Sequence, residues 1–283
     1  MTAPRPGRAS RPPVVLLHAL ALDAAMWRAQ QHALTLRGHR VLAPHQRGFG
    51  GRPLGSEPPS VDLLADDLRR AMDGHGVERA VLAGVSMGGY VAMAFARRWP
   101  DRVLGLGLVS TRAAADDAAA REGRLAFAAA MGDPAAAPGW AAAAAGRLFG
   151  PTTRDRRPRV AAELRAAGAA APPASVAWAQ RAAAGRPDAG PALAALAVPA
   201  LVAVGEEDSL VTVEEAEATA RHLPGARLAV VPTSGHLPPL ETPHTLTALL
   251  ADLLDEVAGT SRVPVPGARH PARVTVHQED LPC

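Results

Sequence analysis

The chain has 283 residues and a mass of 29.1 kDa, and 48% of its residues are hydrophobic, which suits one large α/β domain or two small ones and excludes wholesale disorder. It contains no Lys and a single Cys, Cys283, which excludes lysine-based nucleotide binding or Schiff-base chemistry, intramolecular disulfides and cysteine-based metal clusters. The net charge is only +3 and aromatic residues make up 3%, so we expect no nucleic-acid partner.

The N-terminal residues 1–12 are rich in Pro and Arg, and we expect them to form a flexible arm. The apolar run at 14–22 is similar to the core of a secretory signal, but it contains His18 and follows Pro12 and Pro13 directly. These interruptions favour a short buried strand. The sequence has no stretch of about 18 apolar residues, so we expect no membrane span and a cytoplasmic location.

Beyond the arm, short apolar runs alternate with longer amphipathic or Ala-rich stretches, which is typical of βαβ units around a parallel sheet. Each short run is almost continuously apolar, as expected for strands that helices cover on both faces. The predicted strands are residues 14–18, 40–44, 80–85, 103–109, 198–204 and 227–231. The predicted helices include residues 60–74, 88–98, 212–222 and 243–257.

A long Ala-rich stretch separates the predicted strands at 103–109 and 198–204. Because Ala is the strongest helix former, we expect four short helices there, inserted as a cap over one edge of the sheet. The predicted organisation is an arm at 1–12, a core at 13–111 and 198–258, an all-helical cap at 112–197 and a Pro-rich tail at 259–283.

The sharpest local signal is the run Gly84-Val85-Ser86-Met87-Gly88-Gly89, which lies between a predicted strand and a predicted helix. The pattern G-x-S-x-G at such a turn is typical of a nucleophile elbow. The turn forces the serine into strained backbone space and crowds its neighbours, so the flanking residues must be small. An ordinary strand-to-helix loop is the alternative. We favour Ser86 as a nucleophile.

A serine hydroxyl is a weak nucleophile at neutral pH and needs a neighbouring base, which an acid orients. The loop at 205–208 follows a predicted strand and offers Asp208, and the loop at 233–236 follows the next strand and offers His236. Parallel strands deliver such loops to one shared edge of the sheet. We therefore expect Asp208 and His236 to meet there.

Other carboxylates compete with Asp208 for the role of the acid. Glu206 and Glu207 precede it in the same loop, and Asp116 and Asp117 follow the predicted strand at 103–109. The position within the loop favours Asp208.

At these positions the chain resembles the α/β-hydrolase family, over roughly residues 13–257. The segments that carry the resemblance are Leu17-His18-Ala19-Leu20 with Asp23 and Trp27, Arg47-Gly48-Phe49-Gly50, and residues 84–89, 205–208 and 234–236. The chain is most similar to small bacterial esterases and 3-oxoadipate enol-lactonase-like hydrolases. The resemblance implies an α/β-hydrolase fold, a Ser86–His236–Asp208 triad, and an oxyanion hole formed by the backbone N–H groups of Leu20 and Met87.

The chain departs from the family pattern at two positions. Ala19 replaces the Gly that usually follows the histidine of the oxyanion loop, and His45 stands where relatives tend to have Asp. The second departure leaves the local loop geometry and the polarity of the pocket open. Because the elbow carries Ser86 in place of Asp, the resemblance also argues against haloalkane dehalogenase and epoxide hydrolase chemistry.

The sequence thus predicts a serine hydrolase that cleaves a carboxylic ester or lactone, a small-molecule substrate, without a metal or an organic cofactor. Trp140, Phe149 and Trp178 of the cap are expected to line an apolar pocket or to form the core of the cap. Two alternatives stay open: a perhydrolase, thioesterase or acyl transferase with the same triad, or a non-catalytic ligand-binding protein. The absence of Lys, Asn and Ile, which have AT-rich codons, indicates a GC-rich bacterial genome.

Overall fold

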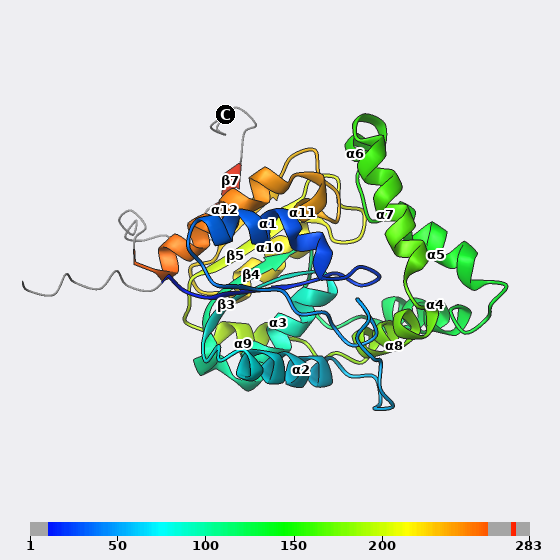
Figure 1. The fold of residues 1–283 in the computed structure, drawn as a ribbon, viewed down its shortest axis with the longest axis horizontal. Coiled ribbons are helices and arrows are strands. Elements are labelled where there is room, and N and C mark those ends of the chain that lie inside the picture. The colour runs from blue at the N-terminus through cyan, green and yellow to red at the C-terminus, as the bar shows by residue number, and fades with distance from the viewer. Residues whose placement is uncertain (1–10, 260–272, 276–283) are drawn as a thin grey trace, which may run out of the picture.

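A parallel β-sheet organises the computed structural model, which describes residues 11–259 and the backbone of 273–275 (Figure 1). Within these residues the sheet has seven strands in the order β2-β1-β3-β4-β5-β6-β7, and every neighbouring pair is parallel. The strands are β1 (Val14–Leu17), β2 (Val41–Leu42), β3 (Ala80–Val85), β4 (Val103–Val109), β5 (Ala200–Gly205), β6 (Arg227–Val231) and β7 (Arg273–Thr275). The predicted parallel sheet is confirmed.

Strands β1, β3, β4 and β5 are apolar throughout because both faces of the sheet are covered there. In β1, Val15 and Leu17 pack into one buried cluster, while Val14 and Leu16 pack into another. Successive side chains of a strand point to opposite faces, so a strand covered on both sides needs a continuous apolar run. This is why the run at 14–17, which resembles part of a secretory signal, forms an inner strand of the sheet.

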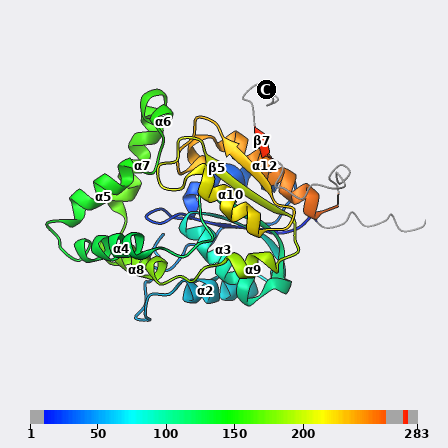
Figure 2. The same cartoon turned by 180° about the vertical axis from the view of Figure 1, so that it is seen from behind.

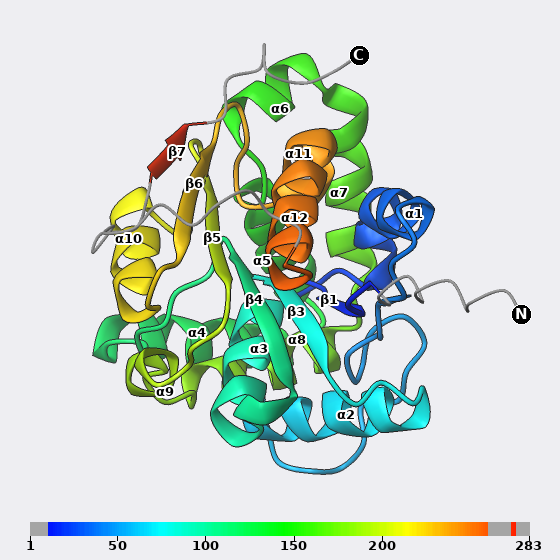
Figure 3. The ribbon, with the colours of Figure 1, turned by 90° about the vertical axis from the view of Figure 1, so that its left-hand side faces the viewer.

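Helices cover the two faces in separate layers (Figure 3). One layer contains α1 and α12, and the other contains α2, α3, α9 and α10. The bounds of these helices are α1 (Arg28–Leu36), α2 (Val61–Gly74), α3 (Met87–Arg98), α9 (Gly190–Ala194), α10 (Val213–His222) and α12 (Pro243–Val257). The five leucines at helical spacing in α12 are all buried, so this helix docks on the sheet as its pattern predicts.

Short elements connect these layers. They are the 3₁₀ helices η1 (Ala24–Trp27) and η2 (Pro100–Arg102) and the four-residue helix α11 (Pro238–Glu241). No helix in the described ranges combines the length and hydropathy of a membrane span.

The stretch 112–197, all of which the structure describes, contains six helices and not the four expected from the sequence. Pro residues occupy the first turns of five of them, because Pro fits a helix start and disrupts a helix interior. The six are α4 (Ala118–Ala130), α5 (Ala137–Gly146), α6 (Pro151–Arg156), α7 (Pro158–Ala170), α8 (Pro173–Ala184) and α9.

Helices α4–α8 lie together on one side of the molecule, as both Figure 1 and Figure 2 show, and we refer to them as the cap. Helix α9 packs against α3 and α10 of the core. Residues 1–10 of the predicted arm, and most of the predicted tail, lie outside the described residues.

Candidate active site

Ser86 lies at a sharp turn between β3 and α3. Its backbone has φ 53° and ψ −114°, a conformation that L-residues rarely adopt. A Cβ atom at Gly84 would lie 2.3 Å from the Gly88 carbonyl, and one at Gly88 would lie 2.1 Å from the Leu17 carbonyl oxygen. The glycines are therefore required by close backbone contacts, which is the steric arrangement that the sequence predicts for a nucleophile elbow.

Hydrogen bonds attach this turn to strand β4. The Ser86 amide donates to the Val109 carbonyl at 2.9 Å, and the Thr111 hydroxyl donates to the Ser86 carbonyl at 2.9 Å. Thr111 is buried. The sequence analysis missed Thr111, since this contact joins neighbouring strands and leaves no local pattern. The bonds hold the strained turn in place.

His236 and Asp208 form a buried pair at the ends of β6 and β5. The His236 Nδ1 atom lies 3.0 Å from Asp208 Oδ1 and 2.9 Å from Oδ2, and the two side chains are only 3% and 0% exposed. With Nδ1–H donating to the carboxylate, the Nε2 atom of His236 carries a free lone pair. This is the tautomer that a general base requires.

Three groups stabilise the charge on Asp208. Burial opposes its ionisation, but His236 and the amides of Leu210 and Val211, at 2.8 and 3.0 Å from Oδ1, lower the pKa of Asp208 below its ordinary value. Asp208 is therefore an ionised acceptor at neutral pH.

The competing carboxylates in the loop of Asp208 face elsewhere. Glu206 is exposed, while Glu207 accepts hydrogen bonds from the amide and the hydroxyl of Thr152 in the cap. Of the carboxylates in this loop, Asp208 is thus the one that contacts His236.

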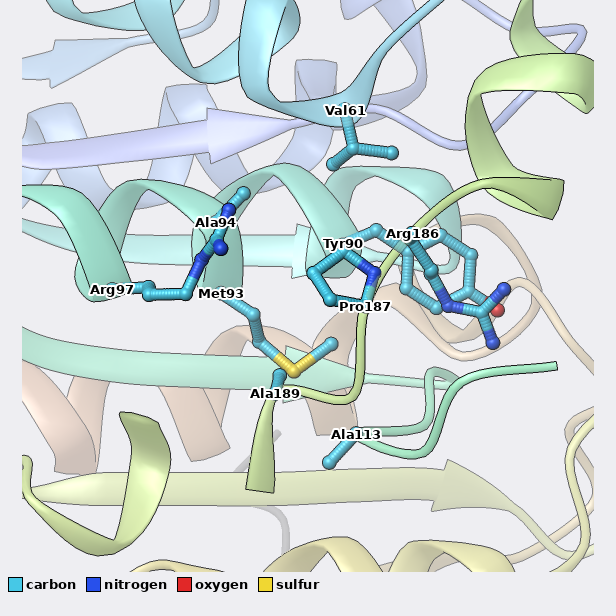
Figure 4. Close-up of a pocket in the computed structure, with 9 residues that line it drawn as sticks. All are labelled: Val61, Tyr90, Met93, Ala94, Arg97, Ala113, Arg186, Pro187 and Ala189. Atoms are coloured by element: carbon cyan, nitrogen blue, oxygen red, sulfur yellow. The ribbon is translucent and has the colours of Figure 1, made fainter. Parts of the chain in front are cut away.

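The two acids that follow β4 have structural partners. Asp116 forms ion pairs with Arg124 at 2.6 Å and with Arg186 at 2.8 Å, and Asp117 accepts a hydrogen bond from the amide of Ala120 at the start of α4. Arg186 lies over the ring of Tyr90 beside a small cavity, which Figure 4 shows. The Asp116 cluster therefore joins the two ends of the cap.

The loop after β1 contains Leu20, the expected second donor of the oxyanion hole. Buried His18 supports this loop: its Nδ1–H donates to the Ala19 carbonyl at 2.9 Å, and its Nε2 accepts from the Gln46 amide at 2.9 Å. Burial lowers the pKa of His18 to about 4, so the ring is neutral. Met87, the first expected donor, begins α3, where an amide has no intrahelical acceptor.

His45, where relatives tend to have Asp, has a structural role. Its Nδ1 atom accepts a hydrogen bond from the Ala24 amide at 3.2 Å, at the start of η1. A Cβ atom at Gly50, which has φ +57°, would lie 1.9 Å from the same Nδ1 atom. The imidazole thus fills the space that Gly50 leaves, and it shapes the loop after β2.

A cleft of about 440 Å³ runs between η1 and helix α7 of the cap. Its apolar lining comes from both sides and includes Leu22, Met26, Phe49, Leu164 and Leu240. Charged side chains also line it: Asp23, Arg28 and Glu163. The lining includes Ala21, next to Leu20 in the loop after β1, and Leu240 of α11, the helix that follows the loop of His236.

The three aromatic residues expected to line a pocket are not among the lining residues of this cleft. Trp178 is buried and donates from Nε1 to the Glu57 carbonyl at 2.9 Å, and Phe149 is buried beneath Arg165. Trp140 is 43% exposed and packs edge-on against Phe127. Whether they contact a substrate or form the core of the cap stays a prediction.

Among residues 11–259, no group of three or more His, Cys, Asp or Glu side chains is arranged to hold a metal ion.

The chain is similar to proteins of known family and structure. Residues 12–243 match the family described as alpha/beta hydrolase fold. The structure is similar to that of a thermophilic esterase from Thermogutta terrifontis, with 39% identity and a TM-score of 0.82 over 87% of this chain and 90% of the esterase. A curated relative, 3-oxoadipate enol-lactonase 2 from Acinetobacter baylyi, is 28% identical over 84% of this chain and 86% of its own length.

A second curated relative matches only in part. Epoxide hydrolase A from Mycobacterium tuberculosis is 38% identical over 109 residues, which are 38% of this chain and 34% of that relative's length. The match therefore spans about a third of that relative.

Proposed function

The chain belongs to the alpha/beta hydrolase fold family, and on this premise we propose that it is a serine hydrolase that cleaves a carboxylic ester or lactone through an acyl-enzyme on Ser86. The observation that carries the proposal is the buried His236–Asp208 pair, which leaves Nε2 free to act as a base. Ser86 directly follows β3, Asp208 lies in the loop after β5 and His236 lies in the loop after β6. All three therefore lie at the carboxyl edge of one parallel sheet.

In the first step, the Ser86 oxygen attacks the carbonyl carbon of the substrate while His236 Nε2 takes the hydroxyl proton. The Asp208 carboxylate stabilises the imidazolium that forms. The amides of Met87 and Leu20 donate to the oxyanion of the tetrahedral intermediate. The imidazolium then gives its proton to the departing alcohol oxygen, which leaves an acyl ester on Ser86.

In the second step, His236 takes a proton from a water molecule, which attacks the acyl ester. The carboxylic acid leaves and Ser86 regains its proton, so the atoms and charges balance. Charges in this buried region interact more strongly than they would in water.

We assign the cleft beside α7 to the part of the substrate that does not react. The apolar side chains that line the cleft suit the carbon skeleton of a substrate. The charged side chains of Asp23, Arg28 and Glu163 line the same cleft and would contact polar groups of that substrate. The esterase and the enol-lactonase named above support an ester or lactone as the scissile group. The partial likeness to an epoxide hydrolase carries less weight, because the elbow holds a serine, whose acyl chemistry differs from epoxide opening.

A fluorophosphonate probe tests this function directly. We expect mass spectrometry to find one adduct, on Ser86, and we expect Ser86→Ala to lose both the adduct and the hydrolysis of short p-nitrophenyl esters. Turnover that depends on an added alcohol, thiol or peroxide acceptor would favour acyl transfer, thioester cleavage or perhydrolysis instead. Folded protein that forms no adduct would favour a non-catalytic ligand-binding protein.

The proposal includes a cytoplasmic location. This location stays a prediction from the sequence; in the structure the apolar run at 14–17 forms strand β1 between two other strands.

A further inference from the structure

Glu241, the last residue of α11, carries a buried carboxylate that the mechanism above does not use. The residue is 2% exposed and lies five positions after His236. Its Oε2 atom accepts hydrogen bonds from the amides of Gly235 at 3.0 Å and Gly150 at 2.9 Å, and its Oε1 atom accepts one from the Leu237 amide at 2.9 Å. A buried charge of this kind is costly unless several donors satisfy it.

Two of these donors lie on either side of the candidate base. Gly235 and Leu237 are the residues directly before and after His236, so one carboxylate holds the backbone at both ends of this residue. The Leu237 amide belongs to the peptide that follows His236, and the Gly235 amide belongs to the peptide between Ser234 and Gly235, so the chain is held on each side of His236 and the direction of its Cα–Cβ bond is restricted. The imidazole then reaches Asp208 with little freedom to rotate away.

The third donor belongs to the cap. Gly150 directly precedes α6, and a Cβ atom at Gly235 would lie 2.3 Å from the Gly150 nitrogen, so the two backbones are in contact. Neighbouring contacts join the same parts: Glu207 binds Thr152, and Arg157 donates to the Thr233 carbonyl at 3.1 Å. The loop of His236 and this part of the cap are thus one hydrogen-bonded unit.

We propose that Glu241 is a positioning residue, which orients His236 through the two amides beside it and connects that orientation to the cap through Gly150. This inference rests on the proposed function. Glu241 touches neither the reacting atoms nor the imidazole in this scheme; it acts through the backbone. A glutamine has the same length but only one acceptor oxygen, and its NH₂ group would face an N–H donor.

The test compares Glu241→Gln, Glu241→Asp and the surface control Glu122→Gln with the wild type. For each protein we would measure the rate constant and the end point of fluorophosphonate labelling at Ser86, kcat and KM for a p-nitrophenyl ester, and Tm. The end point counts competent molecules, while the rate constant reports how well the base activates Ser86 in those molecules. Irreversibly misfolded protein therefore lowers the end point and leaves the rate constant unchanged. A reversibly unfolded fraction would lower the rate constant by that fraction, and the Tm of each variant shows whether such a fraction exists at the assay temperature.

For Glu241→Gln we expect the labelling rate constant and kcat to fall about 10- to 100-fold, as for other displacements of a reacting group, with KM near the wild-type value. Glu241→Asp keeps the charge but is one methylene shorter, and we expect a loss of the same kind. Glu122→Gln should match the wild type. Rate constants at the wild-type level in both Glu241 variants, whatever their end points, would overturn the inference. A wild-type protein that forms no Ser86 adduct would instead overturn the proposed function.

Discussion

The His236 Nδ1 atom faces both carboxylate oxygens of Asp208, at 3.0 and 2.9 Å, although 28 residues separate the two in the chain. The pair lies at the ends of adjacent strands, β5 and β6, whose register pairs Gly205 with Val231. The pairing of β5 with β6 therefore brings the loops of Asp208 and His236 together, and only a few residues in each loop separate the side chain from its strand.

We predict that Asp208→Asn lowers kcat by about 10⁴-fold, because an amide cannot hold the imidazole in the required tautomer or stabilise its cation. Steady-state kinetics with a p-nitrophenyl ester measures the loss. Glu206→Gln changes an exposed carboxylate two residues away and should leave kcat unchanged. Equal losses in both variants would contradict the assignment of Asp208 as the acid.

A second prediction concerns the ion pairs that join the ends of the cap. Removing Asp116 leaves Arg124 and Arg186 without their shared counter-charge, so Asp116→Asn should lower the free energy of unfolding by about 3–5 kcal/mol at neutral pH. Denaturant titration measures this difference.

The pH dependence of that difference has a definite sign. Burial opposes ionisation of Asp116, but Arg186 and Arg124 lower its pKa below the ordinary value. A lowered folded-state pKa gives stability that is fully present above the unfolded-state pKa of about 3.9 and is lost as pH falls through the folded-state pKa. The difference in the free energy of unfolding between wild type and Asp116→Asn should therefore be constant above about pH 5 and become smaller in stronger acid. A difference in the free energy of unfolding that grows in acid would show that the pKa of Asp116 is raised in the folded state.

The cleft beside α7 leads to a prediction on substrate size. Ala167→Trp places a large ring among the lining residues, and we expect kcat/KM for octanoate esters to fall about tenfold more than for acetate esters. Ala166→Trp is the matched control. Ala166 directly precedes Ala167 in α7, is exposed and is not among the residues that line the cleft. If both variants keep the wild-type preference for chain length, the acyl chain lies elsewhere.

The contact between the His236 loop and the cap also limits side-chain size. In Gly235→Ala the new Cβ would meet the Gly150 backbone, so we expect a loss of about 1–3 kcal/mol in stability together with slower ester turnover. Gly74→Ala adds a methyl group where no atom lies within 4 Å and should stabilise slightly or have no effect. Thermal unfolding and kinetics of the two variants check this pair, and equal Tm values would contradict the close packing.

The inner strands β3, β4 and β5 were predictable because they are buried between two helical layers. A strand buried on both faces must be apolar at every position, so β3, β4 and β5 appear as short continuous runs in the sequence. The elbow was predictable for a similar reason, since close backbone contact at Gly84 and Gly88 admits no side chain.

The sequence was less informative about the cap. Ala-rich helices pack with few large side chains, and the pattern could not indicate whether Trp140 and Trp178 face a substrate or the protein. In the structure Trp178 binds the Glu57 carbonyl, which is 121 residues away in the chain. The predicted number of helices in residues 112–197 was also wrong: four were expected and six are present. In a low-complexity stretch, a Pro that begins a helix cannot be told from a Pro that follows the end of one.

What the sequence determined by itself was local: the apolar runs that become strands, the glycines of the elbow, and the loops that offer an acid and a base. These features leave a pattern because neighbouring residues share one physical constraint. Which carboxylate meets His236, which side chains line the cleft, and what Glu241 binds were decided by tertiary structure alone. Glu241 joins the amides of Gly235, Leu237 and Gly150, and a backbone amide is the same in every residue type except proline, so the sequence carries no trace of such a contact.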